Sequence, residues 1–302
     1  MNPGRMLLIL NPAANHGRGL KLLPVIERLL HDQDFSVQLT TGVGHAKTLA
    51  AQAAGHDIVV AVGGDGTVHE VVNGLMQIDA PTRPALGILP IGSGNDTCRT
   101  LGIPKGLTSA IMVLRSGVRR RYDLGRCNDM YFNNSFAIGL DAEVTAKAVE
   151  FKATTPLSGL PLYLLSLVYI LFKQLKSYRF TLTVDSRESS EVEILLMAVT
   201  NGPTYGGGFA ITPDSIPDDG LFDTCTIAPL SLLQTLIRLP FVVVGKHTKM
   251  APVTMSRHQS IVIDSPTPLP AQIDGEVFLR RSYTITMLPS AIEYIVPLAG
   301  VE

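Results

Sequence analysis

A glycine-rich segment with an aspartate inside it, Gly63-Gly64-Asp65-Gly66-Thr67, is the part of the sequence best suited to chemistry. It follows a mostly apolar run, Asp57–Val62, of the kind found in strands buried on both faces, and it precedes a segment with helical character, Val68–Met76. A helix N-terminus offers unpaired N–H groups and a partial positive charge, and glycines let a ligand approach the backbone there. The segment therefore predicts a phosphate-binding loop.

Asp65 is the unusual residue of this loop. A carboxylate repels phosphate unless a Mg²⁺ ion lies between them or a hydroxyl proton is to be removed. Standard nucleotide motifs do not fit, since no GxxxxGK[ST] segment occurs and His69 stands where GxGxxG needs its third glycine. The structural alternative is a tight strand–helix turn in which Asp65 only caps the helix. His69 is expected on the helix surface rather than as a catalytic base.

Two further loops follow expected strands in the same way. The segment Ile91-Gly92-Ser93-Gly94-Asn95-Asp96 comes after the strand Leu86–Leu89, and Asn11–Gly19 comes after the strand Met6–Leu10. Ser93 offers a hydroxyl and Asp96 a second carboxylate. Ligands of open parallel sheets lie beyond the carboxyl ends of the strands, so we expect the three loops to converge on one nucleotide.

The elements that position these loops alternate between strand and helix, which predicts an α/β, doubly wound nucleotide-binding domain. The other expected elements of this half are Leu20–His31, Phe35–Thr40 and His45–Ala54. After Tyr122 short β-like segments dominate and predict a mostly antiparallel β-sandwich domain with helices near Pro161–Lys176 and Ser231–Gly245. Its expected strands are Tyr131–Ile138, Phe180–Asp185, Val192–Val199, Phe222–Ile227, Ser260–Ile263, Ala271–Ile273 and Tyr283–Met287. The expected domains are residues 1–122, completed by 290–302, and residues 123–289.

Composition narrows the function classes. The chain has 302 residues and a formal net charge of −1, which leaves no electrostatic footprint for nucleic acid. Charged residues are 17% of the chain, below the ~25% typical of soluble domains, so large cores, an apolar substrate pocket or a membrane-facing patch are expected. Three widely spaced cysteines indicate a reducing compartment, and the scattered histidines argue against a zinc site. The short apolar run Met6–Leu10 predicts a strand rather than an export signal.

Two apolar segments, Leu160–Phe172 and Leu239–Val244, carry basic residues directly after them. This arrangement suits a membrane interface, and core helices of the second domain explain it almost as well. Five arginines near the domain junction also have two possible explanations. They could belong to a solvated strand edge, or they could contact phosphates or anionic lipid heads. They are Arg115, Arg119, Arg120, Arg121 and Arg126.

As an ordered set, these motifs resemble the diacylglycerol kinase catalytic-domain family, which includes bacterial soluble lipid kinases and sphingosine kinases. The resemblance spans nearly the whole chain. Its motifs are Asn11-Pro12, Gly63 to Thr67 with Glu70 to Gly74, Gly87 to Pro90 with Asn95-Asp96, Asp123-Leu124-Gly125, Asn201-Gly202 with Gly206 to Gly208, Pro213-Asp214 with Asp218 to Leu221, and Asp274-Gly275-Glu276.

The resemblance implies roles for individual residues. ATP would be bound by Asn11, Pro12, Ala13, Ala14, Asn15, Thr40, Gly64, Asp65, Gly66, Thr67, Val68, His69, Glu70 and Ser93. Asp65, Asp96 and Asp123 would form a network around a catalytic Mg²⁺. Glu276, with Asp274 beside it, would stand at the catalytic centre as proton acceptor, a role that Asp65 could also take. A second, structural Mg²⁺ would be held by the Asp219 carboxylate and the carbonyl oxygens of Ile216 and Leu221.

Some positions depart from the family pattern or have simpler explanations. Ala14-Asn15 stands where the family has Ser-Gly, which removes a hydroxyl, although Asn tolerates a left-handed conformation. Ser93 replaces a threonine and keeps the hydroxyl. Ala153 to Thr155 occupy a stretch that is lysine-rich in some members. Taken alone, Asp274-Gly275 is a common hairpin signal and Asp218-Asp219-Gly220 a plausible turn, but adjacent acids repel and a cation would relieve that cost.

The function expected from the sequence is an ATP-dependent lipid kinase that transfers the γ-phosphoryl group to a lipid hydroxyl, with diacylglycerol giving phosphatidic acid. The alternatives are a kinase of a soluble acceptor, similar to NAD kinase, and a non-catalytic nucleotide- or lipid-binding regulator. ATP and Mg²⁺ are the expected cofactors. The expected partners are a lipid substrate at a membrane surface and, for the assembly, a second copy in a homodimer. The expected location is cytoplasmic with peripheral membrane attachment.

Overall fold

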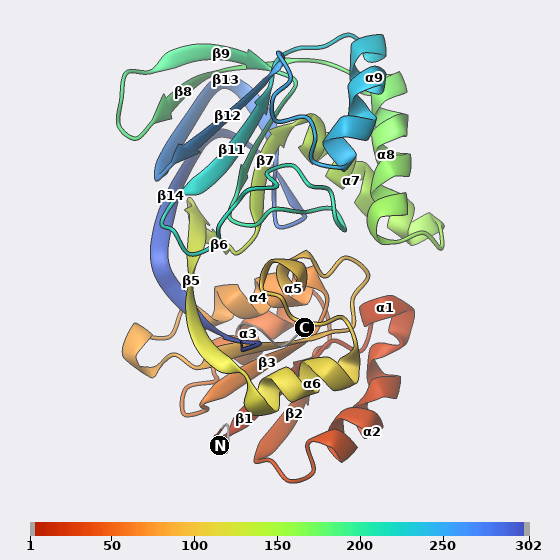
Figure 1. Ribbon diagram of the computed structural model, residues 1–302, viewed down its shortest axis with the longest axis vertical. Helices are drawn as coiled ribbons and strands as arrows, with labels where there is room; N and C mark the ends of the chain where they lie inside the picture. The colour runs from red at the N-terminus through yellow and green to blue at the C-terminus, as the bar shows by residue number, and fades with distance from the viewer. Residues whose placement is uncertain (1–3, 299–302) are drawn as a thin grey trace. The chain divides into compact units, whose positions relative to one another are not determined.

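The computed structural model describes residues 4–298, which form two compact units (Figure 1). The first unit contains the chain up to Tyr122 together with the segment that begins at Ser290. The second unit runs from Asp123 to Pro289. Two long strands, β5 (Val118–Cys127) and β14 (Glu276–Val296), have residues in both units.

The first unit is a parallel sheet with helical crossovers. Its strands pair in the order β2-β1-β3-β4, and the last part of β14 pairs with β4 through Tyr294 and Leu86. The strands are β1 (Met6–Leu10), β2 (Phe35–Leu39), β3 (Ile58–Gly63) and β4 (Ala85–Pro90). The helices are α1 (Ala14–Gly17), α2 (Gly19–Leu29), α3 (His45–Ala51), α4 (Asp65–Leu75), the 3₁₀ turn η1 (Ala80–Thr82), α5 (Asp96–Thr100) and α6 (Leu107–Ser116).

Every residue of β1, β3 and β4 is buried, which explains why these strands read as continuous apolar runs rather than alternating ones. Helices cover both faces of the sheet, with α4 and α6 on opposite sides (Figure 1). Helix α6 packs so closely on β4 that a Cβ at Gly87 would lie 2.3 Å from the Leu114 side chain. A larger residue at this position would require the Leu114 side chain to move, so the glycine serves helix–sheet contact rather than a turn.

The second unit is built from antiparallel strands with three helices. Its strands, besides β5 and β14, are β6 (Met130–Phe132), β7 (Ser135–Gly139), β8 (Tyr178–Val184), β9 (Ser190–Ile194), β10 (Leu196–Thr200), β11 (Phe222–Ile227), β12 (Val253–His258) and β13 (Ser260–Ile273). Its helices are α7 (Leu140–Thr154), α8 (Gly159–Gln174) and α9 (Leu232–Val243). One run of pairing is β12-β11-β10-β7-β13, and β13 also pairs with β8 and β14.

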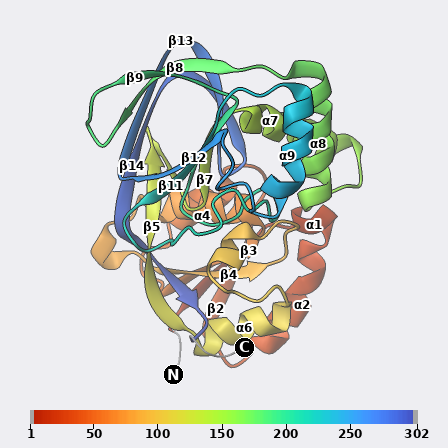
Figure 2. The same cartoon turned by 45° about the horizontal axis from the view of Figure 1, so that its top comes forward.

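Two apolar cores lie on either side of β7 and β10. Phe136 and Val199 face a core enclosed by strands, whereas Ala137 and Ala198 face a second core that α7 and α8 help to cover. Figure 2 shows α8 and α9 side by side along this helical layer. Because both faces of β7 and β10 are covered, every position is buried, and their sequences are apolar except at Ser135 and Thr200.

The structure confirms the expected fold class and corrects several element boundaries. The expected strand Val192–Val199 is two strands, because the chain breaks at Leu195, whose N–H bonds to Ile227 and whose carbonyl accepts from Leu140. Conversely, Ser260–Ile263 and Ala271–Ile273 belong to one strand, β13, with a register shift between Asp264 and Leu269. Helix α7 was not expected, since its apolar residues form no stripe along one face.

A buried carboxyl group, that of Asp141, lies in the helix-covered core. It accepts hydrogen bonds from the hydroxyl of Tyr163 and from the amide of Gln272 at 3.1 Å. Burial raises the pKa of the Asp141 carboxyl above its ordinary value. The native state then holds this proton more tightly than the unfolded chain does. Stability is therefore lost as the pH rises from the unfolded-state pKa towards the folded-state pKa.

The variant Asp141→Asn cannot ionise, so the stability difference between variant and wild type should move in favour of the variant as the pH rises. The expected change is about 1.4 kcal/mol for each unit by which the folded-state pKa is raised. Denaturant unfolding between about pH 4 and pH 8 measures it, with Asp264→Asn, at an exposed position of β13, as the control. A difference for Asp141→Asn that stays as flat as that of the control would contradict this account.

Candidate functional site

The loops singled out in the first unit follow neighbouring strands. The strand order places β1 between β2 and β3. The chain adds β2 on one side of β1 and β3 on the other, so the order in which strands are added changes direction between β1 and β3. Such a switch point opens a crevice at the carboxyl ends of the strands, where ligands of open α/β sheets bind. The loop after β1 starts at Asn11, whose N–H bonds to Val62 at 3.0 Å, and the loop after β4 starts at Ile91, whose N–H bonds to Gly63 at 3.0 Å.

Side chains and backbone tie the three loops to one another. The amide of Asn11 donates to the Thr67 hydroxyl at 3.2 Å, and its carbonyl oxygen accepts the Ala13 N–H at 3.0 Å. A Cβ at Gly92 would lie 2.4 Å from the Cα of Gly64. The loop after β3, here called the second loop, and the loop after β4, the third loop, therefore meet backbone to backbone. A Cβ at Gly66, by contrast, would meet no atom within 4 Å. The three loops therefore converge as expected, and Gly66 borders open space.

Asp65 is the first residue of α4 and lies against the third loop. Its carboxylate accepts the Thr97 N–H at 3.0 Å. Burial of the carboxyl group raises the pKa of Asp65, and the charge of Asp96 raises it further, while the Thr97 amide acts in the opposite direction. The two acids thus repel one another in a site with little solvent, and Arg99 offsets part of that repulsion through its ion pair with Asp96. Carboxylate oxygens are ligands that Mg²⁺ prefers, so this pair fits a bound Mg²⁺.

Asp96 begins α5 and is 3% exposed. It forms an ion pair with Arg99 one turn later in the same helix. The preceding residue, Asn95, has a left-handed backbone (φ 54°), and its amide donates to the Gly92 carbonyl at 2.9 Å. Asn tolerates this conformation better than most residues do. The Asn95 side chain therefore closes the loop, and Ser93 lies exposed at the tip of the loop.

The other residues expected to bind ATP fall into two groups. Pro12, Ala13, Ala14 and Asn15 are exposed or half-buried, and Asn15 is left-handed (φ 51°), so the turn expected of Ala14-Asn15 forms. Thr40 is buried at the end of β2, where its N–H bonds to Leu10 at 2.9 Å.

The side chains of α4 that were expected to bind ATP pack or form hydrogen bonds within the first unit. Val68 is buried in the core of the unit, and the Glu70 carboxylate accepts the Ala46 N–H at 3.0 Å at the start of α3. The expectation of a surface position for His69 was wrong, because its side chain is 3% exposed and packs beside Asn73. The cause is that α4 is buried on nearly all sides, since every residue from Thr67 to Leu75 except Glu70 is buried.

Asp274, in the second unit, has its carboxylate bound to three backbone amides. The donors are Asn133 at 2.9 Å, Asn134 at 3.1 Å and Ser135 at 2.8 Å. Asp274 and Gly275 both have positive φ, 46° and 93°, so the hairpin turn expected from Asp-Gly forms between β13 and β14. The carboxylate thereby holds the β6–β7 loop to this hairpin, which is a structural role.

Glu276 follows that hairpin as the first residue of β14 and is half-buried. Among residues 4–298 its carboxylate has no hydrogen-bond or ion-pair partner, in contrast to Asp274. A carboxylate without a partner is available to accept a proton from a bound hydroxyl group.

Asp123 is 2% exposed and holds an acidic turn in the second unit. Its carboxylate accepts the Gly220 N–H at 2.7 Å, and its own N–H donates to the Pro217 carbonyl at 3.0 Å. The Asn201 amide donates to the carbonyl of Asp123 at 2.9 Å. This hydrogen bond gives the Asn201-Gly202 motif a positioning role that the motif alone did not reveal.

The expected structural Mg²⁺ does not fit the Asp219 carboxylate as it stands in this structure. One carboxylate oxygen accepts the Leu221 N–H at 3.1 Å, and the other forms an ion pair with Arg257. Ile216 lies 49% exposed. Across the part of the chain that the structure describes, no group of three or more His, Cys, Asp or Glu side chains is arranged to hold a metal. Arg257 was missed from the sequence, because nothing local connects it to a turn some forty residues earlier.

The arginines near the junction mostly have protein partners. Arg115 binds Asp32 through two contacts, at 2.5 and 2.6 Å. Arg119 pairs with Glu293 at 3.2 Å, and the Arg120 guanidinium lies 5.4 Å from the Tyr122 ring centroid. These contacts favour the structural explanation of the cluster over a phosphate-binding one.

Comparisons with known proteins cover both units. Family models match at residues 5–127, described as the diacylglycerol kinase catalytic domain, and at residues 134–296, described as the YegS C-terminal NAD kinase beta sandwich-like domain. A diacylglycerol kinase from Staphylococcus saprophyticus is 30% identical, with 97% of this chain and 95% of that protein covered. A diacylglycerol kinase from Mycobacterium tuberculosis is also 30% identical, with 98% and 96% covered.

Two solved structures share the fold. A diacylglycerol kinase from Bacillus anthracis superimposes with a TM-score of 0.75 at 24% identity and covers 98% of both chains. An NAD kinase from Archaeoglobus fulgidus in complex with ATP superimposes with a TM-score of 0.53 at 14% identity, over 96% of this chain and 93% of the other.

The different surroundings of Asp274 and Glu276 predict different effects on stability. Asp274→Asn places an amide group against at least one of the three backbone donors, so it should lower the free energy of unfolding by about 1–3 kcal/mol. Glu276→Gln, the matched control, should change it by no more than about 0.5 kcal/mol. Denaturant unfolding of both variants measures this. Equal effects would show that the Asp274 carboxylate does not hold the β6–β7 loop.

Proposed function

The chain belongs to the diacylglycerol kinase catalytic-domain family, and from this premise we propose that it is an ATP-dependent lipid kinase. It transfers the γ-phosphoryl group of ATP to the hydroxyl of a lipid, with diacylglycerol as the acceptor and phosphatidic acid as the product. The observation that carries the proposal is the buried carboxyl of Asp65, held against the third loop beside Asp96. Two adjacent acids next to a helix N-terminus suit a triphosphate that is bound to a metal ion, because they would repel an anion without one.

In this mechanism the first unit binds and orients the nucleotide. The N-terminus of α4 and the glycine backbone from Gly64 to Gly66 bind phosphate oxygens, because they offer amide groups with no side chain in the way. Asn11 and Thr67 fix the neighbouring loop. Asp65 and Asp96 would hold Mg²⁺, which neutralises phosphate charge when it is bound.

Proton transfer is the task of a carboxylate. Glu276 is the residue we assign to it, since its carboxylate has no partner among residues 4–298 while that of Asp274 is bound to three amides. The lipid hydroxyl donates its proton to Glu276 as the oxygen attacks the γ-phosphorus, and the bond to the β-phosphate oxygen breaks. Asp65 is the other candidate acceptor, but a carboxylate that holds Mg²⁺ is a poorer base, which favours Glu276 for the proton transfer.

An apolar pocket in the second unit supports a lipid acceptor. Its cavity volume is about 60 Å³, and it lies between α7, α8, α9 and the sheet. Leu167, Phe209, Ile227 and Val242 are among the residues that line it, and Asp141 and Arg238 are its acidic and basic members. A lining of this composition suits an apolar molecule with a few polar contacts. An acyl chain matches the lining better than a soluble dinucleotide does, and a cavity of about 60 Å³ must widen to admit it.

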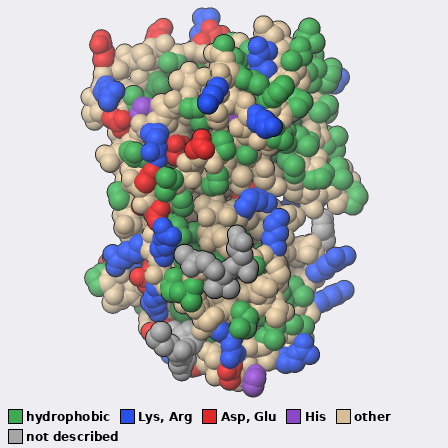
Figure 3. Space-filling view, in the orientation of Figure 1, with side chains coloured by type: hydrophobic (Ala, Val, Ile, Leu, Met, Phe, Trp, Pro, Cys, Tyr) green, Lys and Arg blue, Asp and Glu red, His purple; other side chains and the backbone are tan. Residues whose placement is uncertain are grey.

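A membrane surface is the proposed source of the lipid. Large apolar side chains on α8 and α9 are exposed, among them Phe172 at 60% and Leu233 at 68%. Figure 3 shows apolar side chains gathered over this part of the second unit. Apolar helix faces with nearby lysines bind at the interface of a bilayer rather than across it. Among the described residues no single helix is long and apolar enough to span a membrane, and α7 and α8 reach that length only together, across a bend of 117°.

Turnover of wild type and two variants tests the proposal. Wild type should phosphorylate diacylglycerol in vesicles when ATP and Mg²⁺ are present, and it should not phosphorylate NAD. Asp65→Asn and Glu276→Gln should each lower kcat by about 10²–10⁴-fold while the thermal midpoint stays within a few degrees of wild type. Radiolabelled lipid product measures this. Near-normal turnover by both variants, or activity towards NAD alone, would contradict the assignment.

A further inference from the structure

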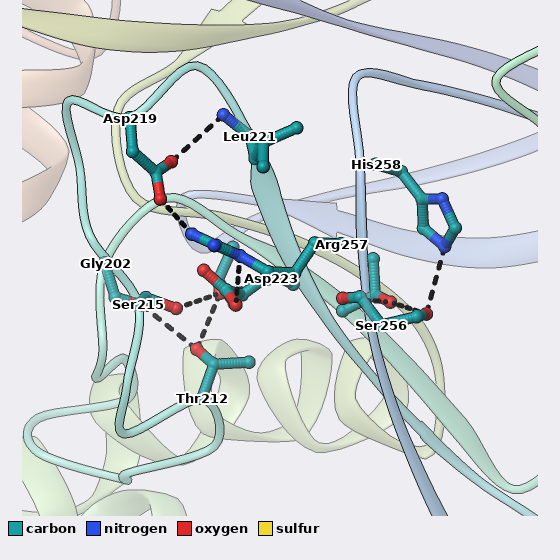
Figure 4. A network of polar contacts seen from close by, with 11 residues as sticks. Gly202, Thr212, Ser215, Asp219, Leu221, Asp223, Ser256, Arg257 and His258 are labelled. Carbon is teal, nitrogen blue, oxygen red and sulfur yellow. Dashed lines mark hydrogen bonds and ion pairs between the residues drawn. The ribbon is translucent and has the colours of Figure 1, made fainter.

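An acidic turn in the second unit is neutralised by an arginine of the neighbouring strand. Asp214, Asp218, Asp219 and Asp223 lie within ten residues of one another in the sequence. The Arg257 guanidinium forms an ion pair with Asp219 and a second one with Asp223, from Nε to Oδ1 at 3.3 Å. Figure 4 shows the guanidinium lying between the two carboxylates.

The sheet fixes the position of Arg257. Asp223 on β11 and Arg257 on β12 are directly paired in the antiparallel register. From there the long side chain reaches back to Asp219, which lies before β11 begins. The side chains of Asp219 and Asp223 are 23% and 13% exposed, whereas that of Arg257 is 43% exposed, so solvent screens the two ion pairs from the arginine side. Backbone pairing thus delivers a positive charge to the turn whether or not a metal is present.

The base of the turn is held separately by hydroxyl groups. Thr200 and Thr212 share a hydrogen bond at 2.6 Å, and Thr200 also contacts the Ser215 hydroxyl at 3.3 Å and the Asp223 carbonyl at 3.2 Å. Thr212 donates to the Gly202 carbonyl at 3.2 Å (Figure 4). At the tip, the Asp219 carboxylate is held by the Leu221 N–H and by Arg257.

The tip in turn positions Asp123. The Gly220 N–H bonds to the Asp123 carboxylate at 2.7 Å, one residue after Asp219. A change in the Asp219 ion pair therefore reaches Asp123 through a single peptide unit. This connection makes Arg257 a positioning residue for a carboxylate of the expected catalytic network.

We propose that the guanidinium of Arg257 takes the place of the divalent cation that the sequence analysis led us to expect at this turn. Both oxygens of Asp219 are already engaged, by the Leu221 N–H and by Arg257. A Mg²⁺ ion needs near-octahedral oxygen ligands and gives up its water reluctantly. The turn is therefore ordered without metal, and it becomes a metal site only when Arg257 is removed.

Thermal unfolding in EDTA and in MgCl₂ at matched ionic strength tests this inference. Arg257→Gln should lower the unfolding midpoint in EDTA by about 2–4 °C, and MgCl₂ should restore it. The double variant Arg257→Gln with Asp219→Asn should not be restored. Arg179→Gln is the matched control, since Arg179 pairs with Glu193 at 2.8 Å in the same unit. Wild type and this control should respond equally to MgCl₂.

A second measurement applies even where Arg257→Gln fails to fold. Mn²⁺ binding, followed by electron paramagnetic resonance without nucleotide, should be the same for wild type and Asp219→Asn. Loss of a bound Mn²⁺ in Asp219→Asn would overturn the inference, as would unchanged stability of Arg257→Gln in EDTA. Neither measurement depends on catalysis, so its outcome is separate from that of the lipid kinase proposal.

Discussion

The contact between the glycines of two loops is the constraint on which the rest of the site depends. A Cβ at Gly92 would lie 2.4 Å from the Gly64 Cα, so the loops after β3 and β4 can touch only because neither residue has a side chain. Their contact sets Asp65 against the Thr97 amide and beside Asp96. The folded chain thereby keeps two like charges together in a poorly solvated place, which costs stability. Such a cost is expected at a functional site and has no use in a simple turn.

The carboxylates of the chain differ in what holds them, and this difference separates their roles. Asp274 is bound to three backbone amides and Asp219 to an amide and an arginine, so both are occupied by the fold. Asp65 and Asp96 lie together, and Arg99, which pairs with Asp96, offsets only part of their repulsion. Glu276 has no partner among residues 4–298 and is available for proton transfer. The sequence motifs do not distinguish these acids from one another, whereas their hydrogen bonds do.

Much of the fold could be predicted from the sequence because its signals are local. Continuous apolar runs indicated the buried parallel strands, and the Asp-Gly pair indicated the β13–β14 hairpin. The family resemblance is confirmed by models that match both units. Contacts between distant segments could not be predicted. The burial of His69 depends on packing around nearly all of α4, and the position of Arg257 depends on the register of β12 on β11.

Equilibrium binding of ATP to the wild-type protein tests the central claim most directly. Isothermal titration calorimetry in the presence of Mg²⁺ and in the presence of EDTA compares the metal complex with the free nucleotide. If Asp65 and Asp96 share their site with a metal–triphosphate complex, ATP should bind with Mg²⁺ and lose at least about tenfold in affinity in EDTA. Equal affinity under both conditions, or no binding in either, would contradict the account.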